Sequence, residues 1–313
     1  MAVRRFILTM CTFAAASAVA AEVPLATPAP GADLLGNVNF AVDRDGVHVS
    51  EVRLGGVHAC GAYLDALGYG ARPTDDDGVA ASRGGAAPSI SRSRDTAASA
   101  IRAETGFLEV AGRTRLVGNA TWRAEPVAQT TLALVAAGDL VAAQPAIDRG
   151  IAYGFVGGSA TRPIAERITA SGVAGYQTFT DGNERLDMRA RLTWQAVPQL
   201  GLDAQLRWRQ FESRDDLGDP TYFNPDRYAQ WTGVIDVHRQ VRGWTIAGMV
   251  GAGVETIDGT ERHSVRTAEL RATGAIVENV HVTVYARYNR SADDADVPET
   301  SFVQAGVTLR HPF

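Results

Sequence analysis

Apolar and polar residues alternate one by one along several stretches of this 313-residue chain. In residues 185–195 every second residue is Leu, Met, Ala, Leu or Trp, and Arg, Asp, Thr and Gln lie between them. Residues 202–209, 280–289 and 303–313 show the same period of two. This period places all apolar side chains on one face of a strand, whereas a helix would mix the two sets. These stretches therefore predict amphipathic β-strands.

The length of these segments favours strands that cross a membrane. About 9 to 11 tilted residues span a bilayer, whereas strands of soluble proteins average about 5 to 6 residues. Aromatic residues lie near segment ends, as in the interfacial girdles of membrane barrels, at Trp122, Trp194, Trp208, Trp231, Trp244 and Tyr288. A soluble sandwich also buries one face of each strand and is the alternative. In hydrocarbon an open sheet edge stays unpaired, so such strands must close into a barrel.

Both ends of the chain point to an exported protein. Residues 1–21 combine Arg4 and Arg5, an apolar stretch and small residues in A-x-A spacing, which predicts a signal peptide. Residues 22–33 are rich in proline and are predicted as a periplasmic lead-in, followed by the barrel at 34–313. The terminal Phe313 follows an alternating strand and resembles the C-terminal assembly signal of bacterial outer-membrane barrels. We therefore expect the protein in the outer membrane of a Gram-negative bacterium.

The predicted architecture is all-β, a transmembrane antiparallel up-and-down barrel of about 14 strands, in an even number between roughly 12 and 16. Residues 197–200 and 276–279 are predicted as short periplasmic turns. Residues 72–96, 212–228 and 291–301 are predicted as longer outer loops. The first of these is rich in Gly, Ser, Arg and Asp, and whether it plugs the lumen stays open.

Charge and motif content exclude several kinds of function. The net charge of −5 and the pI of about 5.7 offer no basic field for nucleic acid. The six histidines form neither HExxH nor a paired metal spacing, so no metal and no cofactor are expected. His263 and Ser264 are adjacent on a predicted strand and face opposite sides, so they cannot exchange a proton. We predict no catalytic residues and no enzyme.

The polar face of the alternating strands carries charges of both signs. The residues expected to line the lumen are Arg185, Asp187, Arg189, Arg191, Asp203, Arg207, Arg209 and Arg287. In one interpretation these side chains border a water-filled passage. In the other they pair across neighbouring strands and fill a plugged barrel. Both interpretations stay open because the strand number sets the width of the lumen.

Three segments of the sequence resemble a known family. Residues 176–185 read YQTFTDGNER and residues 219–228 read DPTYFNPDRY, and residues 146–153 read AIDRGIAY. Together they resemble the C-terminal outer-membrane barrel of bacterial exopolysaccharide export porins of the poly-N-acetylglucosamine and cellulose export type. They are also similar to short YaiO-like outer-membrane barrel proteins. The resemblance covers roughly residues 127–313.

Each motif also has a physical interpretation of its own. A tight turn with positive φ between two membrane strands suits Asp181, Gly182 and Asn183. A rigid loop bearing aromatic side chains is predicted at Tyr222, Phe223, Asn224 and Pro225. That loop either docks on the barrel rim as a clip or contacts sugar rings directly.

The resemblance implies a porin through which a secreted polysaccharide leaves the cell. The large export proteins resemble a helical-repeat scaffold followed by a barrel, and this chain shows no such repeats. Either a separate periplasmic scaffold is a partner, or the barrel has a different role. The other expected partners are outer-membrane lipids and lipopolysaccharide, the barrel-assembly machinery and the polysaccharide itself. The alternatives are a general solute porin, or a closed barrel acting as an anchor, an adhesin or a lipid-modifying enzyme.

Overall fold

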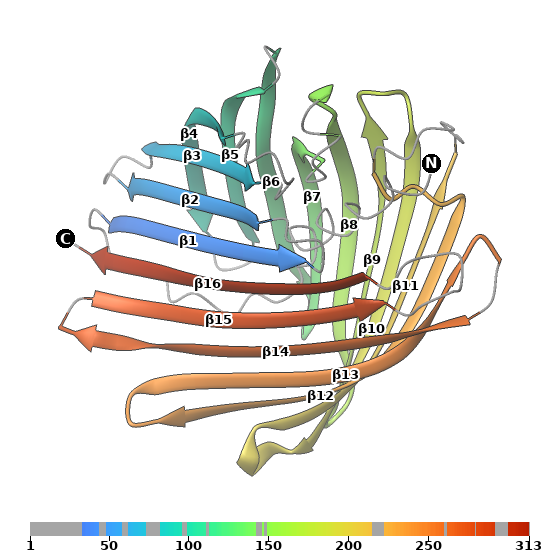
Figure 1. Cartoon of the computed structure of the whole chain (residues 1–313). Coiled ribbons are helices and arrows are strands. Elements are labelled where there is room, and N and C mark those ends of the chain that lie inside the picture. Colours follow the sequence, from blue (N-terminus) through green and yellow to red (C-terminus); the bar gives the residue numbers. More distant parts are fainter. Residues whose placement is uncertain are drawn as a thin grey trace.

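A computed structural model describes residues 33–43, 48–57, 62–72, 82–95, 99–110, 113–141, 146, 149–214, 222–259, 262–278, 280–291 and 300–312. Within these residues, sixteen antiparallel strands hydrogen-bond to their neighbours in chain order, and β1 pairs with β16 to close the barrel (Figure 1). The predicted all-β antiparallel fold is confirmed. The sixteen strands are two more than the predicted value of about 14 and lie at the upper end of the expected range.

The strands are 10 to 16 residues long, which is sufficient for tilted strands to cross a bilayer. The first eight are β1 (Asp33–Asp43), β2 (His48–Val57), β3 (Ala62–Arg72), β4 (Ser82–Asp95), β5 (Ser99–Val110), β6 (Arg113–Val127), β7 (Thr130–Leu140) and β8 (Ala152–Ala165). The other eight are β9 (Ile168–Phe179), β10 (Glu184–Val197), β11 (Leu202–Ser213), β12 (Arg227–Val241), β13 (Trp244–Ile257), β14 (Arg262–Val277), β15 (Val280–Ser291) and β16 (Thr300–Pro312).

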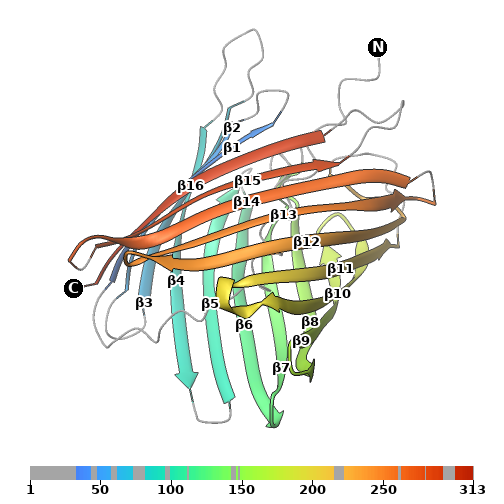
Figure 2. The ribbon, with the colours of Figure 1, turned by 90° about the horizontal axis from the view of Figure 1, so that it is seen from below.

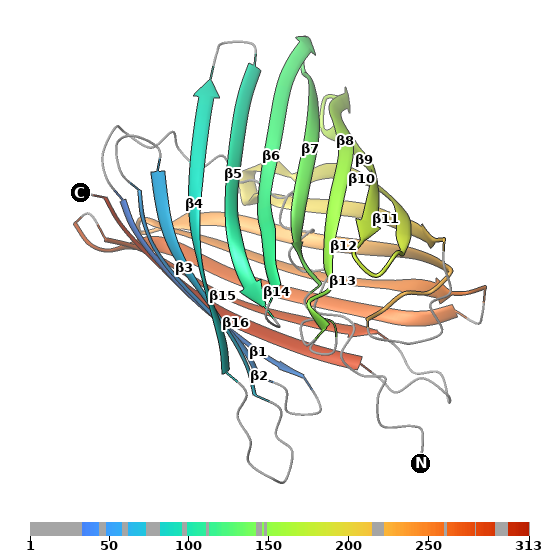
Figure 3. The same ribbon diagram turned by 90° about the horizontal axis from the view of Figure 1, so that it is seen from above.

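The strands form one continuous wall around the interior. In Figure 2, strands β4 to β8 run steeply while β12 to β16 run nearly across the view. Figure 3 shows the same crossing from the opposite side, with the orange and red strands behind the green ones. Strands that are tilted in the same sense around a barrel cross in this way when opposing walls are superimposed in projection.

Connections of two kinds alternate along the chain and define two ends of the barrel. At the turn end, the 3-10 turn η2 (Pro198–Leu200) joins β10 to β11, and β14 is joined to β15 between Val277 and Val280. These are the two short turns predicted from the sequence. Gly201 closes the first turn with φ +62°, and a Cβ there would collide with the carbonyl oxygen of His238. At the opposite end, the loop end, longer connections follow β7, β11 and β15.

The prediction of an outer loop at 72–96 is wrong for most of its length. Residues Ser82–Asp95 form β4, which pairs with β3 on one side and with β5 on the other. The Gly- and Ser-rich segment lacks a clear apolar period, so its sequence does not indicate a strand. Backbone groups of the two neighbouring strands nevertheless supply its hydrogen bonds. These residues are therefore part of the wall and do not plug the lumen.

Several predictions fall on residues that the structure does not describe. These are the signal peptide at 1–21, the lead-in at 22–33 apart from Asp33, and the assembly signal at Phe313. They stay predictions. In the part of the chain that the structure describes, no helix has both the length and the apolar character needed to cross a bilayer.

Candidate functional site

The two faces of the barrel wall have the reverse polarity of a soluble protein. On β10, Leu192 and Trp194 are 40% and 51% exposed on the outer face, while Asp187 on the inner face is 3% exposed. The same alternation continues on β12 and β14, where Ile235 and Leu270 are 55% and 59% exposed. Apolar side chains on the outside and charged ones on the inside are typical of a barrel wall that is surrounded by lipid hydrocarbon. The candidate functional site is therefore the inner wall.

The pairing of β10 with β11 sets the predicted lining residues side by side. Arg189 lies opposite Arg209, and Arg191 lies opposite Arg207. Because residues two apart share a face, these four guanidinium groups project from the same side of the sheet. Like charges directly across a pair of strands repel each other unless a counter-charge lies between them.

Asp187 supplies that counter-charge for one of the two arginine pairs. Its carboxylate accepts a hydrogen bond from Arg189 at 2.7 Å and forms an ion pair with Arg209 at 3.3 Å. The Asp187 side chain is only 4% exposed, whereas those of Arg189 and Arg209 are 23% and 17% exposed. One buried carboxylate is thus held between two guanidinium groups, so the group as a whole carries a positive charge.

A second group of the same composition lies on β14 and β15. Glu269 forms ion pairs with Arg271 at 3.1 Å and with Arg287 at 2.8 Å. The carboxylate is 15% exposed, and the two arginines are 40% and 22% exposed. Arg287 was predicted to line the lumen, whereas Glu269 and Arg271 were not. Their alternation with Leu270 and the outward Ile276 is the signal that could have identified them.

Arg191 and Arg207 have a different environment. The Arg207 guanidinium donates to Gln205 Oε1 at 2.9 Å and contacts the sulfur of Met249 at 3.7 Å. Within the described residues, neither Arg191 nor Arg207 forms an ion pair with a carboxylate. We refer to Arg189, Arg191, Arg207, Arg209, Arg271 and Arg287 together as the arginine belt.

Arg185 lies on the inner face as predicted, but it does not border free space. Its side chain is 3% exposed and lies 4.4 Å from the centre of the Phe211 ring. The guanidinium donates to the carbonyl oxygen of Phe223 at 2.9 Å and to Asn224 Oδ1 at 3.0 Å. Arg185 therefore holds a loop in place, and contact with a passing solute is excluded by its burial.

The turn at residues 181–183 and the segment at residues 222–225 meet at this point. Asn183 is fully buried and donates through Nδ2 to the hydroxyl of Tyr222 at 3.0 Å and to Asn224 Oδ1 at 2.7 Å. The preceding turn has the predicted positive φ, with Gly182 at +99°. Residues 222–226, which we call the clip loop, are thus fixed to the turn between β9 and β10. Of the two interpretations of this loop, the clip docked at the barrel rim agrees with the structure.

Aromatic packing completes the attachment of the clip loop. Tyr222 stacks on Phe179 at 5.2 Å and belongs to a buried cluster with Val141, Ala146 and Ile151 from the connection between β7 and β8. Burial raises the pKa of the Tyr222 phenol above its usual value, so the hydroxyl stays protonated. Phe223 contacts Phe211 and Tyr228 edge to face at 6.0 and 5.7 Å. The rings thus pack on one another, and Pro225 of the same loop is buried.

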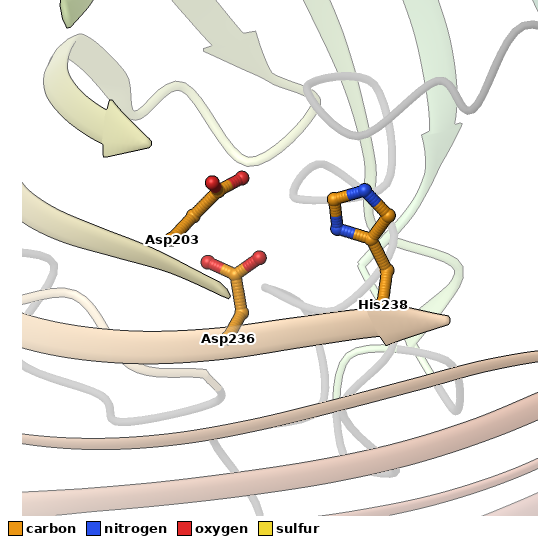
Figure 4. Close-up of side chains that lie close together, drawn as sticks. All are labelled: Asp203, Asp236 and His238. Carbon is orange, nitrogen blue, oxygen red and sulfur yellow. The ribbon is translucent and has the colours of Figure 1, made fainter. Parts of the chain in front are cut away.

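One set of side chains has the donor types that a divalent cation prefers. Asp203 and Asp236 lie directly opposite each other on β11 and β12, and His238 follows on the same face (Figure 4). Their candidate ligand atoms all lie within 4.8 Å of one another. The Asp236 carboxylate also accepts a hydrogen bond from Gln205. Sequence spacing did not predict this set, because strand pairing brings Asp203 to residues 33 and 35 positions later in the chain.

His263 and Ser264 occupy opposite faces of β14. His263 is 6% exposed on the inner face, beside Glu255 of β13, and Ser264 is exposed on the outer face. Glu255 in turn accepts a hydrogen bond from the Tyr228 hydroxyl at 2.7 Å. The structure thus confirms that His263 and Ser264 cannot act as a catalytic pair.

Comparison with known proteins gives a structural match and no sequence match. No protein-family model matches the chain, and no curated protein matches it significantly. Among solved structures, a "Bacterial polysaccharide outer membrane secretin" superimposes with a TM-score of 0.71 and 10% identity, over 92% of this chain and 100% of that chain. The outer membrane protein OprD of Pseudomonas aeruginosa gives a TM-score of 0.48 and 14% identity, over 90% of this chain and 94% of that chain. OccK7 (OpdD) of the same organism gives a TM-score of 0.49 and 10% identity, over 90% of this chain and 98% of that chain.

The first of these matches extends over almost the whole chain and supports an assignment of fold. The predicted likeness to the barrel of polysaccharide export porins is confirmed at this level. The chain has the fold of a bacterial outer-membrane β-barrel and resembles a polysaccharide secretin in structure.

Proposed function

We propose that this protein is an outer-membrane porin through which a secreted polysaccharide leaves the cell. The observation that carries the proposal is that the described strands close into a barrel whose inner wall keeps charged side chains partly exposed, from 17% for Arg209 to 40% for Arg271. A plugged barrel would bury such groups. The likeness in fold to a bacterial polysaccharide secretin supports the same function.

The proposed mechanism is passive. Guanidinium, amide and hydroxyl groups along the wall hydrogen-bond sugar hydroxyls weakly and at many positions, so that a polymer can both enter and leave. The turn end faces the periplasm and the loop end faces outward, as in barrels with short periplasmic turns. No catalytic step and no cofactor take part. The barrel-assembly machinery, outer-membrane lipids and a separate periplasmic scaffold are the proposed partners.

The clip loop contributes rigidity to the loop end of the passage. Its anchors, Asn183 and Arg185, are buried and hydrogen-bonded, and its aromatic rings pack on one another. A loop held in this way keeps the opening at constant width while polymer passes. In this proposal the clip loop does not select the sugar.

The test is the conductance of the refolded protein in planar bilayers, with and without oligosaccharides. We expect stable channels that sugar oligomers block from the periplasmic side more strongly than monosaccharides do. Arg191→Trp places a large side chain on the inner wall and should lower the conductance. The neighbouring Ala190 is exposed on the outer face, so Ala190→Trp serves as the matched control. Folded protein without channels, or channels that pass sugars of every size equally, would contradict export.

A further inference from the structure

The arginine belt presents more positive than negative charge to the lumen. Its six guanidinium groups, at Arg189, Arg191, Arg207, Arg209, Arg271 and Arg287, share two ion-paired carboxylates, Asp187 and Glu269. Asp203 and Asp236 lie on the same wall at the neighbouring positions of β11 and β12. With Asp203, Asp236 and the buried Glu255 and Arg185 included, seven guanidinium groups face five carboxylates on the inner wall of β10 to β15.

Burial adds to this imbalance. In each ion-paired group the carboxylate lies beneath the arginines, with Asp187 at 4% and Glu269 at 15% exposure. The arginine side chains that pair with them are 17% to 40% exposed. A solute in the lumen therefore meets the positive groups first. In a narrow space with low-dielectric walls, such a surface concentrates anions.

From this arrangement we infer that the lumen is an anion-selective passage, and that the exported polysaccharide carries carboxylate groups, as a uronic acid polymer does. Arginine presents two parallel N–H donors that match a carboxylate, so each guanidinium with a free edge can bind one acidic sugar residue. Arg191 and Arg207, which have no carboxylate ion pair among the described residues, are the positions that contribute most. This inference rests on the proposed export function and specifies its substrate class.

The chemistry distinguishes an acidic polymer from a neutral one. A neutral polymer would use the hydroxyl and amide groups of the wall and would gain little from six arginines. An acidic polymer would be drawn into the belt by charge and would move between successive guanidinium groups. Because the contacts are partly exposed to water, each is weak, and binding remains reversible.

The experiment measures ion selectivity and block in the same bilayers. In a KCl gradient we expect a reversal potential that indicates preference for Cl⁻ over K⁺. Hexagalacturonate should block the channel at a lower concentration than maltohexaose, a neutral oligomer of the same length. The double variant Arg191→Gln with Arg207→Gln should shift the reversal potential towards K⁺ and raise the half-blocking concentration of hexagalacturonate on the order of tenfold.

Two further variants separate charge from shape and position. Arg191→Lys with Arg207→Lys keeps both charges and should retain the preference for Cl⁻, while block by hexagalacturonate weakens because the paired N–H donors are lost. Arg266 is exposed on the outer face of β14, the strand that carries Arg271. Arg266→Gln removes one positive charge outside the lumen and should leave both selectivity and block unchanged.

The outcomes for the two proposals differ. Channels that prefer K⁺, or that maltohexaose blocks as strongly as hexagalacturonate, would overturn the acidic substrate while leaving polysaccharide export in place. Channels that neither sugar blocks would count against both proposals. If no conductance is seen, export is contradicted, and calorimetry of hexagalacturonate binding to the refolded protein then tests only whether the arginine belt binds acidic sugars. The inference is supported if hexagalacturonate binds more tightly than maltohexaose and if the Gln double variant binds it more weakly. Equal affinities for the two sugars would overturn the inference.

Discussion

Arginines occupy two regions of the inner wall, and the exposure of their guanidinium groups separates the regions. Beneath the clip loop, Arg185 is 3% exposed and donates to Phe223 and Asn224. In the arginine belt, Arg189 and Arg271 are 23% and 40% exposed and still reach the lumen. A buried, fully engaged guanidinium stabilises the fold, whereas a partly exposed one is accessible to a solute. Arginine therefore stabilises the fold beneath the clip loop, and it lines the lumen in the arginine belt.

The largest expected effect is in the clip region. Phe211 is fully buried and packs against Tyr228, Phe223 and Arg185. Phe211→Ala should lower the free energy of unfolding by about 3 to 5 kcal/mol, because the ring's contacts are lost and a cavity remains. Urea titration of the protein in lipid vesicles, followed by tryptophan fluorescence, measures it. An effect below about 1 kcal/mol would show that the Phe211 ring does not hold the clip region together.

Asn183→Ala is expected to have the next largest effect. It removes both hydrogen bonds from Nδ2 and leaves the buried Tyr222 hydroxyl and Asn224 Oδ1 with one partner fewer, at a cost of about 1 to 3 kcal/mol. Tyr222→Phe removes only the hydroxyl and should cost less, about 1 kcal/mol. The same urea titration compares the two variants. A larger loss for Tyr222→Phe than for Asn183→Ala would contradict the central role of Asn183.

In the arginine belt, a substitution should affect ion selectivity more than it affects stability. Arg191→Gln should change the free energy of unfolding by less than about 1 kcal/mol, because the side chain is partly exposed and has no ion-paired carboxylate among the described residues. In bilayers, the same substitution should shift the reversal potential in a KCl gradient towards K⁺. If Asn183→Ala shifted the selectivity as much as Arg191→Gln does, the division between the two regions would fail.

The smallest effect is expected at the rim of the loop end. Arg214 and Glu184 form an ion pair at 2.9 Å in which the two side chains are 76% and 32% exposed. Hydrogen bonding to Glu184 raises the pKa of Arg214, so the guanidinium stays positively charged at neutral pH. Arg214→Ala should leave the free energy of unfolding nearly unchanged in the urea titration, because solvent screens an exposed ion pair. The variant should also leave channel conductance unchanged, and a large change would mean that the rim takes part in gating.

Prediction from the sequence succeeded where a single strand carries the information. The alternation in residues 185–195 assigned Arg185, Asp187, Arg189 and Arg191 to one face and Leu192 to the other, because successive side chains of a strand point to opposite sides. It failed at β4, where Gly, Ser and Arg leave no period to detect. It also missed Glu269 and Arg271, although their strand alternates, because charged residues there are interspersed with Ala and Thr.

The sequence by itself determined that the strands are amphipathic, how long they are, and which residues share a face, since each of these properties is local to one strand. Only the tertiary structure decided which residues meet across strands. Asn183 reaches Tyr222, 39 positions away, and Glu269 lies between Arg271 and Arg287. Such contacts depend on register and on the folding of loops, which the period of a single strand does not encode. The division between buried anchors and exposed lining residues therefore appears only once the barrel is closed.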